Sequence, residues 1–244
     1  KNCGFEVMEW IFDTIHPNPI LTSEGRKEID GLSTNYNISI NSVCADYFME
    51  KKLFSETSEN IEKNFEKFKE LIDCCVNLNI SHIEIPFVDS SSLKTDQNKK
   101  ELIKNIKKIL EYIEKNNIFI NLETDLNPID FKKLIEQINH PNMKINYDSG
   151  NSASLQYNVV EELNILDKWI QNVHVKDRKI NGGTIPLGAG DTNFEEFFSM
   201  LSKIDYSGDL IIQGARQSEI NFKPIETCQI YHKFVKQYVD KYYI

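Results

Sequence analysis

The sequence predicts an α/β fold in which parallel strands alternate with helices and close into an eight-stranded barrel. Apolar runs of strand length alternate with amphipathic helical runs along the chain, at roughly 30 to 40 residues per pair. Four of the strand-like runs end in polar residues, as is typical of a barrel whose site lies at the carboxyl ends of its strands. No linker or low-complexity segment divides the chain, so we expect residues 1–244 to form a single domain.

The first half of the chain contains three strand–helix pairs. Thr22 or Ser23 suits the N-cap of the first helix, because a hydroxyl there accepts a hydrogen bond from the first turn. The helix capped by Ser58 carries apolar residues at helical spacing. In order, we expect a strand at 4–12, a helix at 22–36, a strand at 38–44, a loop at 45–57, a helix at 58–78, a strand at 80–87, a polar loop at 89–92 and a helix at 96–115.

The second half continues the alternation. Pro128 suits the first turn of a helix, and residues 149–151 (Ser-Gly-Asn) are expected to make a sharp turn after a strand. In order, we expect a strand at 118–123, a helix at 128–138, a strand at 143–148, a helix at 159–169, a strand around His174, a helix at 194–203, a strand at 210–214 and a helix at 224–238.

These runs contain seven strands, whereas a closed barrel of this type needs eight. We expect one more strand to precede Lys1, and residues 1–4 to end the helix that follows that strand, with Gly4 at its C-terminal cap. The competing interpretation is an open, doubly wound sheet, which would not place the polar strand ends in a closed ring.

Composition narrows the class of function. The formal net charge of −9 argues against nucleic acid and anionic membrane surfaces as partners. Five cysteines occur without a CxxC pair, which favours reduced thiols and a cytoplasmic protein, with Cys44, Cys74 and Cys75 in the core. No apolar run approaches the length of a membrane span. The sequence leaves a homo-oligomer open.

Polar side chains at the ends of four successive strands are expected to form a ring. Side chains alternate along a strand, so the polar residues of each strand end share one face. Glu123, Asp148 and His174 supply carboxylate and imidazole ligands for Mn²⁺, Mg²⁺, Co²⁺ or Zn²⁺, and Gln213 adds a weaker carbonyl ligand. A lone His in a strand is more often a satisfied core residue, but the four ends together favour a metal site.

Further residues give weaker signals. Lys176, Asp177 and Arg178 could hold a substrate phosphate or form a solvated salt-bridge cluster, and the two interpretations are equally supported. Glu84 shares a strand face with His82, where lining of the lumen and a structural role are also equally supported.

Seven short motifs together resemble one known family. They are EWIF at 9–12, CADY at 44–47, EIPF at 84–87, LET at 122–124, YDSGN at 147–151, HVKDR at 174–178 and PLGAGD at 186–191. In order, and over nearly the whole chain, they resemble the sugar phosphate isomerase/epimerase family, the xylose isomerase-like TIM barrel group. The resemblance implies a TIM barrel with a divalent metal held by Glu123, Asp148 and His174. The family's fourth ligand is usually a Glu on the last strand, and here that position is Gln213.

By this resemblance the chain is a metal-dependent isomerase or epimerase that moves a proton next to the carbonyl of a small sugar or sugar phosphate. The family's epimerases use two Glu residues as acid and base, and Gln213 cannot act as a base. A one-base reaction with Glu123 as base and Lys176 as acid stays open. So do a dehydratase of the inosose or dehydroshikimate type and a sugar-phosphate-binding barrel without turnover. An engineered Gln213 that traps a substrate is another interpretation.

We expect the sugar to lie under the loops at 89–92 and 178–191. Trp10 would stack on its apolar face, and Glu84 and Asn151 would line the pocket. Arg178 and Arg216 would hold an anionic end. Apurinic-site endonucleases also resemble this group, but only five His in the chain and the negative net charge count against that activity.

Overall fold

A computed structural model describes residues 3–15, 17–215 and 223–243 of the chain. Its residues form two compact units, which are described separately below. The amino-terminal unit is Glu6–Ile145, and the carboxyl-terminal unit is Asn146–Ile244 together with Lys1–Phe5. The expectation of a single domain over 1–244 stays a prediction. None of the described helices is long and apolar enough to span a membrane.

The amino-terminal unit is built on parallel strands that follow the order of the chain. Each strand pairs in parallel with the next, which confirms the predicted parallel arrangement. Cys44, Glu84 and Asn121 stand level on three adjacent strands, so their side chains point to the same face of the sheet. The strands are β1 (Val7–Ile11), β2 (Ser39–Cys44), β3 (His82–Phe87), β4 (Phe119–Thr124) and the first half of β5 (Met143–Asp148).

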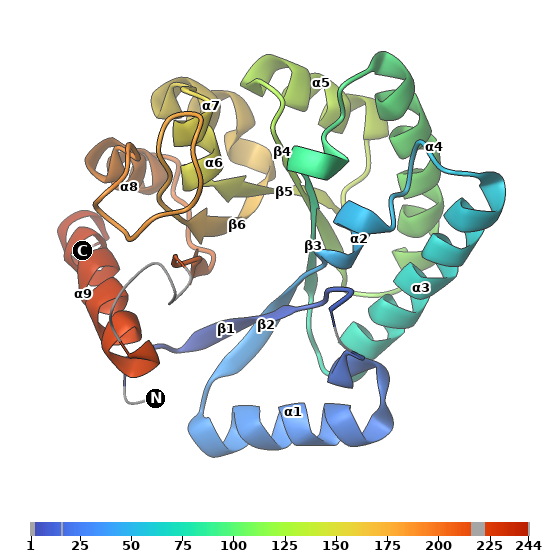
Figure 1. Ribbon diagram of the computed structural model, residues 1–244, viewed down its shortest axis with the longest axis horizontal. Helices are drawn as coiled ribbons and strands as arrows, with labels where there is room; N and C mark the ends of the chain where they lie inside the picture. The colour runs from blue at the N-terminus through green and yellow to red at the C-terminus, as the bar shows by residue number, and fades with distance from the viewer. Residues whose placement is uncertain (1–2, 16, 216–222, 244) are drawn as a thin grey trace. The chain divides into compact units, whose positions relative to one another are not determined.

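Helices connect these strands, and most of them begin at a side chain that caps the first turn. Thr22, Thr57, Thr95 and Asn127 each accept a hydrogen bond from a backbone N–H of the helix that follows. Ser58 is therefore the first helical residue, and the cap lies one position earlier than predicted. The helices are η1 (Pro19–Leu21), α1 (Ser23–Tyr36), α2 (Tyr47–Glu50), α3 (Ser58–Asn77), η2 (Asp89–Ser91), α4 (Asp96–Ile113) and α5 (Pro128–Ile138). Helices α3 and α4 lie side by side (Figure 1).

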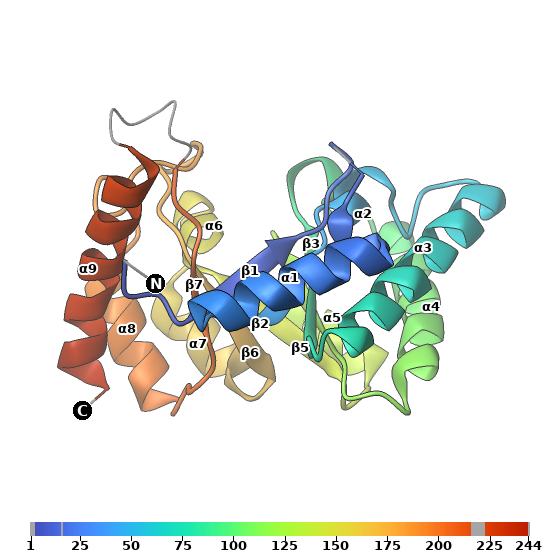
Figure 2. The same ribbon diagram turned by 90° about the horizontal axis from the view of Figure 1, so that it is seen from below.

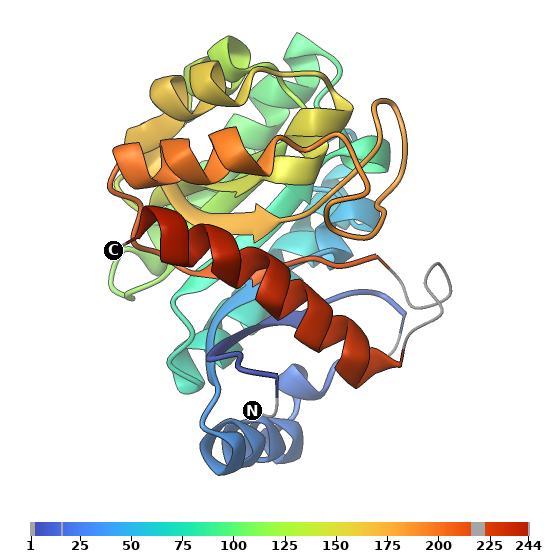
Figure 3. The same ribbon diagram turned by 90° about the vertical axis from the view of Figure 1, so that its left-hand side faces the viewer.

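The carboxyl-terminal unit contains the end of β5 and two further strands that pair in parallel with each other. Its elements are α6 (Ser149–Ser154), α7 (Val159–Leu166), η3 (Asp167–Trp169), β6 (Ile170–Val175), α8 (Phe194–Lys203), β7 (Leu210–Ile212) and α9 (Pro224–Tyr242). Helices α8 and α9 run side by side (Figures 2 and 3). The rings of Phe198 and Tyr238 stack between them, with centroids 5.0 Å apart. This aromatic contact joins the two helices through a buried core.

A buried acidic group packs against β5 on the face opposite Asp148. The Tyr147 hydroxyl donates to the Glu162 carboxyl (2.8 Å), and the Ser152 hydroxyl donates to the same oxygen. Glu162 is only 6% exposed. Burial raises the pKa of Glu162 to about 7, although both hydrogen bonds favour the ionised form. This carboxyl therefore titrates near neutral pH.

Three details differ from the sequence expectation. Residues 149–151 are not a sharp turn but the first turn of α6, because the Asp148 carboxylate accepts the Asn151 N–H (2.8 Å) and caps a helix there. Part of the predicted loop at 45–57 forms α2, and β7 ends at Ile212 rather than at Gly214. Among the residues described here, the sheet has seven strands in the order of the chain, and an eighth strand before Lys1 stays a prediction.

Candidate functional site

Three buried glutamates lie on strands of the amino-terminal unit, Glu9 and Glu84 within their strands and Glu123 near the carboxyl end of its strand. Glu9 on β1, Glu84 on β3 and Glu123 on β4 are at most 9% exposed. The Ser42 hydroxyl on β2 donates to Glu9 (2.8 Å). Keeping carboxylates ionised away from water is costly, and a bound cation would offset that cost. Glu9 is a member of this group that the sequence analysis did not single out.

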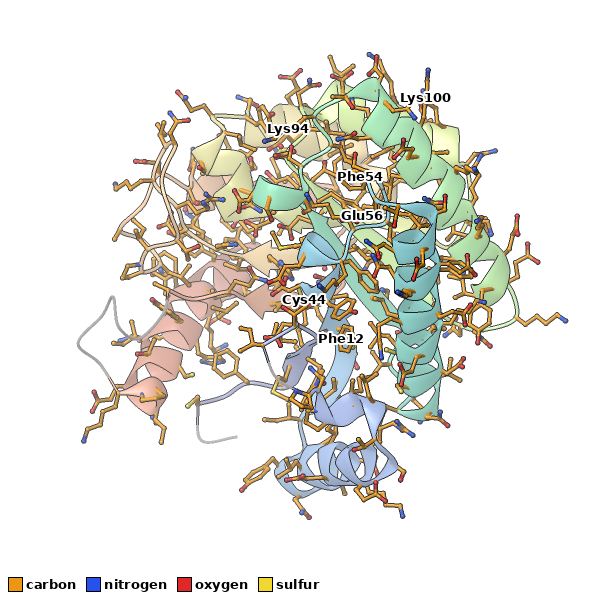
Figure 4. The ribbon with its side chains drawn as sticks, turned by 45° about the vertical axis from the view of Figure 1, so that its right-hand side comes forward. Phe12, Cys44, Phe54, Glu56, Lys94 and Lys100 are labelled. Carbon is orange, nitrogen blue, oxygen red and sulfur yellow. The ribbon has the colours of Figure 1, made fainter. Side chains whose placement is uncertain are left out.

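Cys44 lies close enough to these carboxylates for their charges to act on its thiol. Its thiol is buried as predicted, and the Phe12 N–H on the neighbouring strand segment donates to the Cys44 carbonyl (2.9 Å); both residues are labelled in Figure 4. Burial is the largest cause that raises the pKa of Cys44 well above its usual range. The negative charges of Glu9, Asp46, Glu84 and Glu123 raise it further. The thiol is therefore an inert neutral group among acids.

Two other residues named from the sequence have local partners in this unit. The Asn121 amide lies 3.3 Å from His82 Nδ1, and the His82 ring stacks on Phe119 with centroids 5.3 Å apart. The Trp10 indole N–H donates to the Asn18 side chain (2.9 Å), and Trp10 follows Glu9 on β1, so the two side chains point to opposite faces. Stacking of Trp10 on a sugar stays a prediction.

In the carboxyl-terminal unit, Asp148 and His174 form a buried acid–imidazole pair. Asp148 Oδ2 lies 3.9 Å from His174 Nδ1, and the two side chains are 1% and 0% exposed. The Lys176 ammonium lies 3.2 Å from the same Asp148 oxygen. The other oxygen, Oδ1, accepts the Asn151 N–H at the start of α6. The predicted alternation on β6 is thus confirmed for His174 and Lys176, which both reach Asp148.

The His174 ring is also held by amide side chains. The Asn146 amide nitrogen lies 2.9 Å from His174 Nδ1, and Asn172 donates to the Asn146 carbonyl oxygen (3.3 Å). The Asn146 side chain, held in turn by Asn172, therefore fixes the orientation of the imidazole.

Ser149 fastens the start of α6 to the end of β6. Its hydroxyl accepts the Lys176 N–H (3.0 Å) and lies 2.8 Å from the Lys176 carbonyl and 3.2 Å from the His174 carbonyl. The next residue, Gly150, has to be small, because a Cβ there would lie 2.8 Å from the Lys176 side chain. The Ser-Gly pair therefore lets Lys176 pass close to the helix and reach Asp148.

The sequence signature of one known family matches residues 1–224 of the chain. The chain belongs to the xylose isomerase-like TIM barrel family. The predicted fold class and the predicted family are both confirmed.

Two curated proteins resemble the chain. A Haemophilus influenzae protein that carries the provisional name L-ribulose-5-phosphate 3-epimerase SgbU is 26% identical over an alignment of 260 positions, which covers 99% of this chain and 89% of that protein. A 3-dehydroshikimate dehydratase from Bacillus anthracis is 24% identical over 149 residues, which span 52% of this chain and 53% of the dehydratase.

Solved structures show the same fold. A xylose isomerase domain protein from Planctomyces limnophilus has a TM-score of 0.81 at 17% identity, covering 99% of this chain and 91% of that chain. A xylose isomerase-like TIM barrel protein from Mycobacterium smegmatis, solved in complex with magnesium, has a TM-score of 0.74 at 15% identity, covering 97% and 84%.

Asp177, which follows Lys176 in the xylose isomerase-like chain, has a role that the sequence analysis missed. Its fully buried carboxylate accepts the N–H groups of Gly188 (2.9 Å), Gly190 (2.8 Å) and Thr192 (3.1 Å). A Cβ at Gly190 would lie 1.9 Å from this carboxylate. For Asp177 both a phosphate contact and a solvated cluster were wrong, because it anchors the loop at 186–192. The GAGD motif was the available signal.

The remaining predicted residues lie around this loop and β7. The Arg178 guanidinium donates to the Asn151 side chain (2.6 Å) and to the Gly182 carbonyl (2.9 Å). Gln213 lies one residue beyond β7, where its N–H donates to the Val175 carbonyl (3.0 Å). Because Ile211 stands level with His174, Gln213 follows on the same face of the sheet. Arg216 lies outside the described residues. Binding roles for Arg178, Asn151 and Gln213 stay predictions.

Proposed function

We propose that this xylose isomerase-like chain is a divalent-metal-dependent epimerase or isomerase of a small sugar or sugar phosphate. The observation that carries the proposal is the buried Asp148–His174 pair with Lys176 on the same carboxylate, in a chain of this family. The provisional name of the Haemophilus influenzae relative supports the sugar phosphate class of substrate. The magnesium complex of the Mycobacterium smegmatis protein supports a divalent ion in this family.

The residues present fit a divalent ion. Asp148 Oδ2 and His174 Nδ1 lie 3.9 Å apart, less than twice the usual metal–ligand distance of about 2.1 Å, so one ion could reach both if it displaced the Asn146 amide from Nδ1. We propose that Glu123 is the third ligand, on the grounds that this family's strand ends supply the site, and that Gln213 is a neutral fourth. Oxygen and imidazole ligands suit Mn²⁺, Mg²⁺, Co²⁺ or Zn²⁺.

Chemistry at the site would divide between the ion and the side chains. When bound, the ion would polarise the substrate carbonyl and the neighbouring hydroxyl. Glu123 would remove the proton from the carbon next to that carbonyl, because a carboxylate can act as a base and Gln213 cannot. Lys176 would supply the proton, and its ammonium already lies next to Asp148. A single base favours isomerisation over two-base epimerisation.

Two other functions have specific support. The similarity to the Bacillus anthracis dehydratase over about half the chain favours loss of water from a sugar acid or inosose, which one base can also start. Gln213, which lowers the negative charge at the last strand by one, favours a barrel that binds a sugar phosphate without turning it over.

Solvent deuterium exchange separates these functions. Ketoses and ketose phosphates incubated with the metal-loaded protein in D₂O are analysed by mass spectrometry and NMR. We expect deuterium at the carbon next to the carbonyl, together with an epimer or an aldose. Glu123→Gln should abolish the exchange, and Glu136→Gln, an exposed change on α5, should leave it intact. Binding with no exchange would contradict the enzyme, and release of water with an unsaturated product would favour the dehydratase.

A further inference from the structure

The five cysteines of the chain fall into two groups. Cys44, Cys74 and Cys75 are buried, whereas Cys3 and Cys228 are partly exposed. Cys3 and Cys228 belong to the same unit, although 225 positions separate them in the sequence. Cys3 and Cys228 take no part in the proposed sugar chemistry.

The described start of the chain packs along α9 (Figure 2). Cys3 Sγ lies 3.8 Å from the Ile225 carbonyl oxygen. The Phe5 ring meets the His232 ring edge-on with centroids 5.3 Å apart, and a Cβ at Gly4 would lie 2.6 Å from the His232 ring. The segment therefore touches α9 at two points seven residues apart.

Cys228 lies between those two points on the same face of α9. Residues three and four positions apart share one face of a helix, so Cys228 stands in line with Ile225 and His232. Side chains on a helix tilt toward its amino terminus, which directs the Cys228 thiol toward Ile225, where Cys3 Sγ lies. The geometry thus brings two thiols from opposite ends of the chain together.

The electrostatics of Cys228 agree with this placement. Its pKa is raised by burial first, and then by the Cys3 thiol, which also shares a hydrogen bond with it. A thiol with a raised pKa is a poor attacking nucleophile, since the thiolate is the reactive form. Cys228 therefore suits only the second step of a thiol exchange, which is an attack within the same chain, where its closeness to Cys3 offsets the small thiolate fraction.

We propose that Cys3 and Cys228 are a modification site at which a small-molecule disulfide installs a reversible intrachain disulfide. The Cys3 thiolate attacks one sulfur of the small disulfide, expels one small thiolate and forms a mixed disulfide. The Cys228 thiolate then attacks the Cys3 sulfur and expels the second small thiolate. Two protein thiols are oxidised to one disulfide, the small disulfide is reduced to two thiols, and the two protons pass to those leaving groups.

The disulfide would tie the start of the chain to α9. Closing so long a loop restricts the unfolded chain, so the oxidised protein should be more stable than the reduced one. For a chain of this size we expect the melting temperature to rise by roughly 5–10 °C on oxidation. Dithiothreitol should reverse the shift.

The test uses the full chain with oxidised glutathione as the oxidant. We expect the thiols titrated after denaturation to fall from five to three, and a Cys3–Cys228 peptide to appear in a non-reducing digest. Cys3→Ser and Cys228→Ser should each prevent the cross-link and the rise in melting temperature. Cys74→Ser, a buried control, should retain both.

Three results would overturn the proposal. They are a cross-link between other cysteines, a disulfide between two chains on a non-reducing gel, and stable glutathione adducts on wild type without ring closure. Cys3→Ser changes a side chain outside the helices, so we expect this variant to keep its fold even if Cys228→Ser destabilises α9. Circular dichroism checks the fold of both variants.

Discussion

His174 Nδ1 and Asp148 Oδ2 lie 3.9 Å apart, and each of the two side chains is at most 1% exposed to solvent. If one ion bridges them, His174→Ala should weaken Mn²⁺ binding by at least about 100-fold, because an imidazole ligand is lost. Isothermal titration measures the change. His140→Ala, a control between α5 and β5, should bind like wild type. Equal affinity for His174→Ala would remove His174 from the metal site.

Lys176 lies 3.2 Å from the Asp148 oxygen that we assign to the metal. Its positive charge competes with a divalent ion for that carboxylate, so Lys176→Met should tighten Mn²⁺ binding by about tenfold. Turnover should fall at the same time, because the proposed acid is gone. Lys179→Met, which removes a more exposed lysine paired with Asp191 (3.4 Å), is the matched control. Weaker metal binding in Lys176→Met would contradict this competition.

Gln213→Glu places a carboxylate where the family usually has one. We expect tighter Mn²⁺ binding, since an anionic oxygen replaces a neutral amide, and a gain in epimerase activity if a second base is restored. Titration and deuterium exchange are measured on both forms. Gln97→Glu adds the same charge at an exposed position of α4 and should change neither metal affinity nor deuterium exchange. Unchanged affinity in Gln213→Glu would mean that this side chain does not reach the ion.

Asp177→Asn should destabilise the fold by about 2–4 kcal/mol. The buried carboxylate accepts three backbone N–H groups, and an amide offers only one acceptor oxygen, so at least one of these donors loses its partner. Urea unfolding measures the loss, and hydrogen exchange should speed up at Gly188, Gly190 and Thr192. Asp240→Asn, in an exposed ion pair on α9, should cost less than 1 kcal/mol as a rough bound. Comparable losses in both variants would argue against the loop anchor.

Glu162 should make stability depend on pH between about 4.5 and 7. Its folded pKa of about 7 lies above the ordinary value of 4.5, so over this range the folded state keeps a proton that the unfolded state has lost. Stability therefore falls as pH rises, by about 3 kcal/mol in all, and levels off above the folded pKa. Glu162→Gln should flatten this slope in unfolding measured at pH 5 and pH 8. An unchanged slope would assign the pH dependence to other groups.

Local sequence signals predicted most of the fold. Thr22 caps α1 and Pro128 begins α5 as expected, because caps and proline act within one helical turn. The alternation of β6 likewise placed His174 and Lys176 on one face.

Interactions with residues that are distant in the sequence were not predicted. The sequence around Asp148 is compatible both with a turn and with a helix N-cap, so it did not predict that Asp148 caps α6. The role of Asp177 depends on Thr192, fifteen residues later, and that of Glu9 depends on Cys44 and Ser42 on the next strand. Such partners are set by the tertiary fold and not by the neighbouring residues.

The hydrogen bonds between Ser149 and the end of β6 have a consequence for metal affinity. With Asn151 holding one Asp148 oxygen and Ser149 holding the backbone of β6, the carboxylate loses its rotational freedom when the protein folds, before any ion arrives. The conformational entropy of ordering Asp148 is then part of the folding free energy and does not oppose binding. Ser149→Ala would shift that entropic cost to the moment of ion capture, weakening affinity although the variant keeps every proposed ligand.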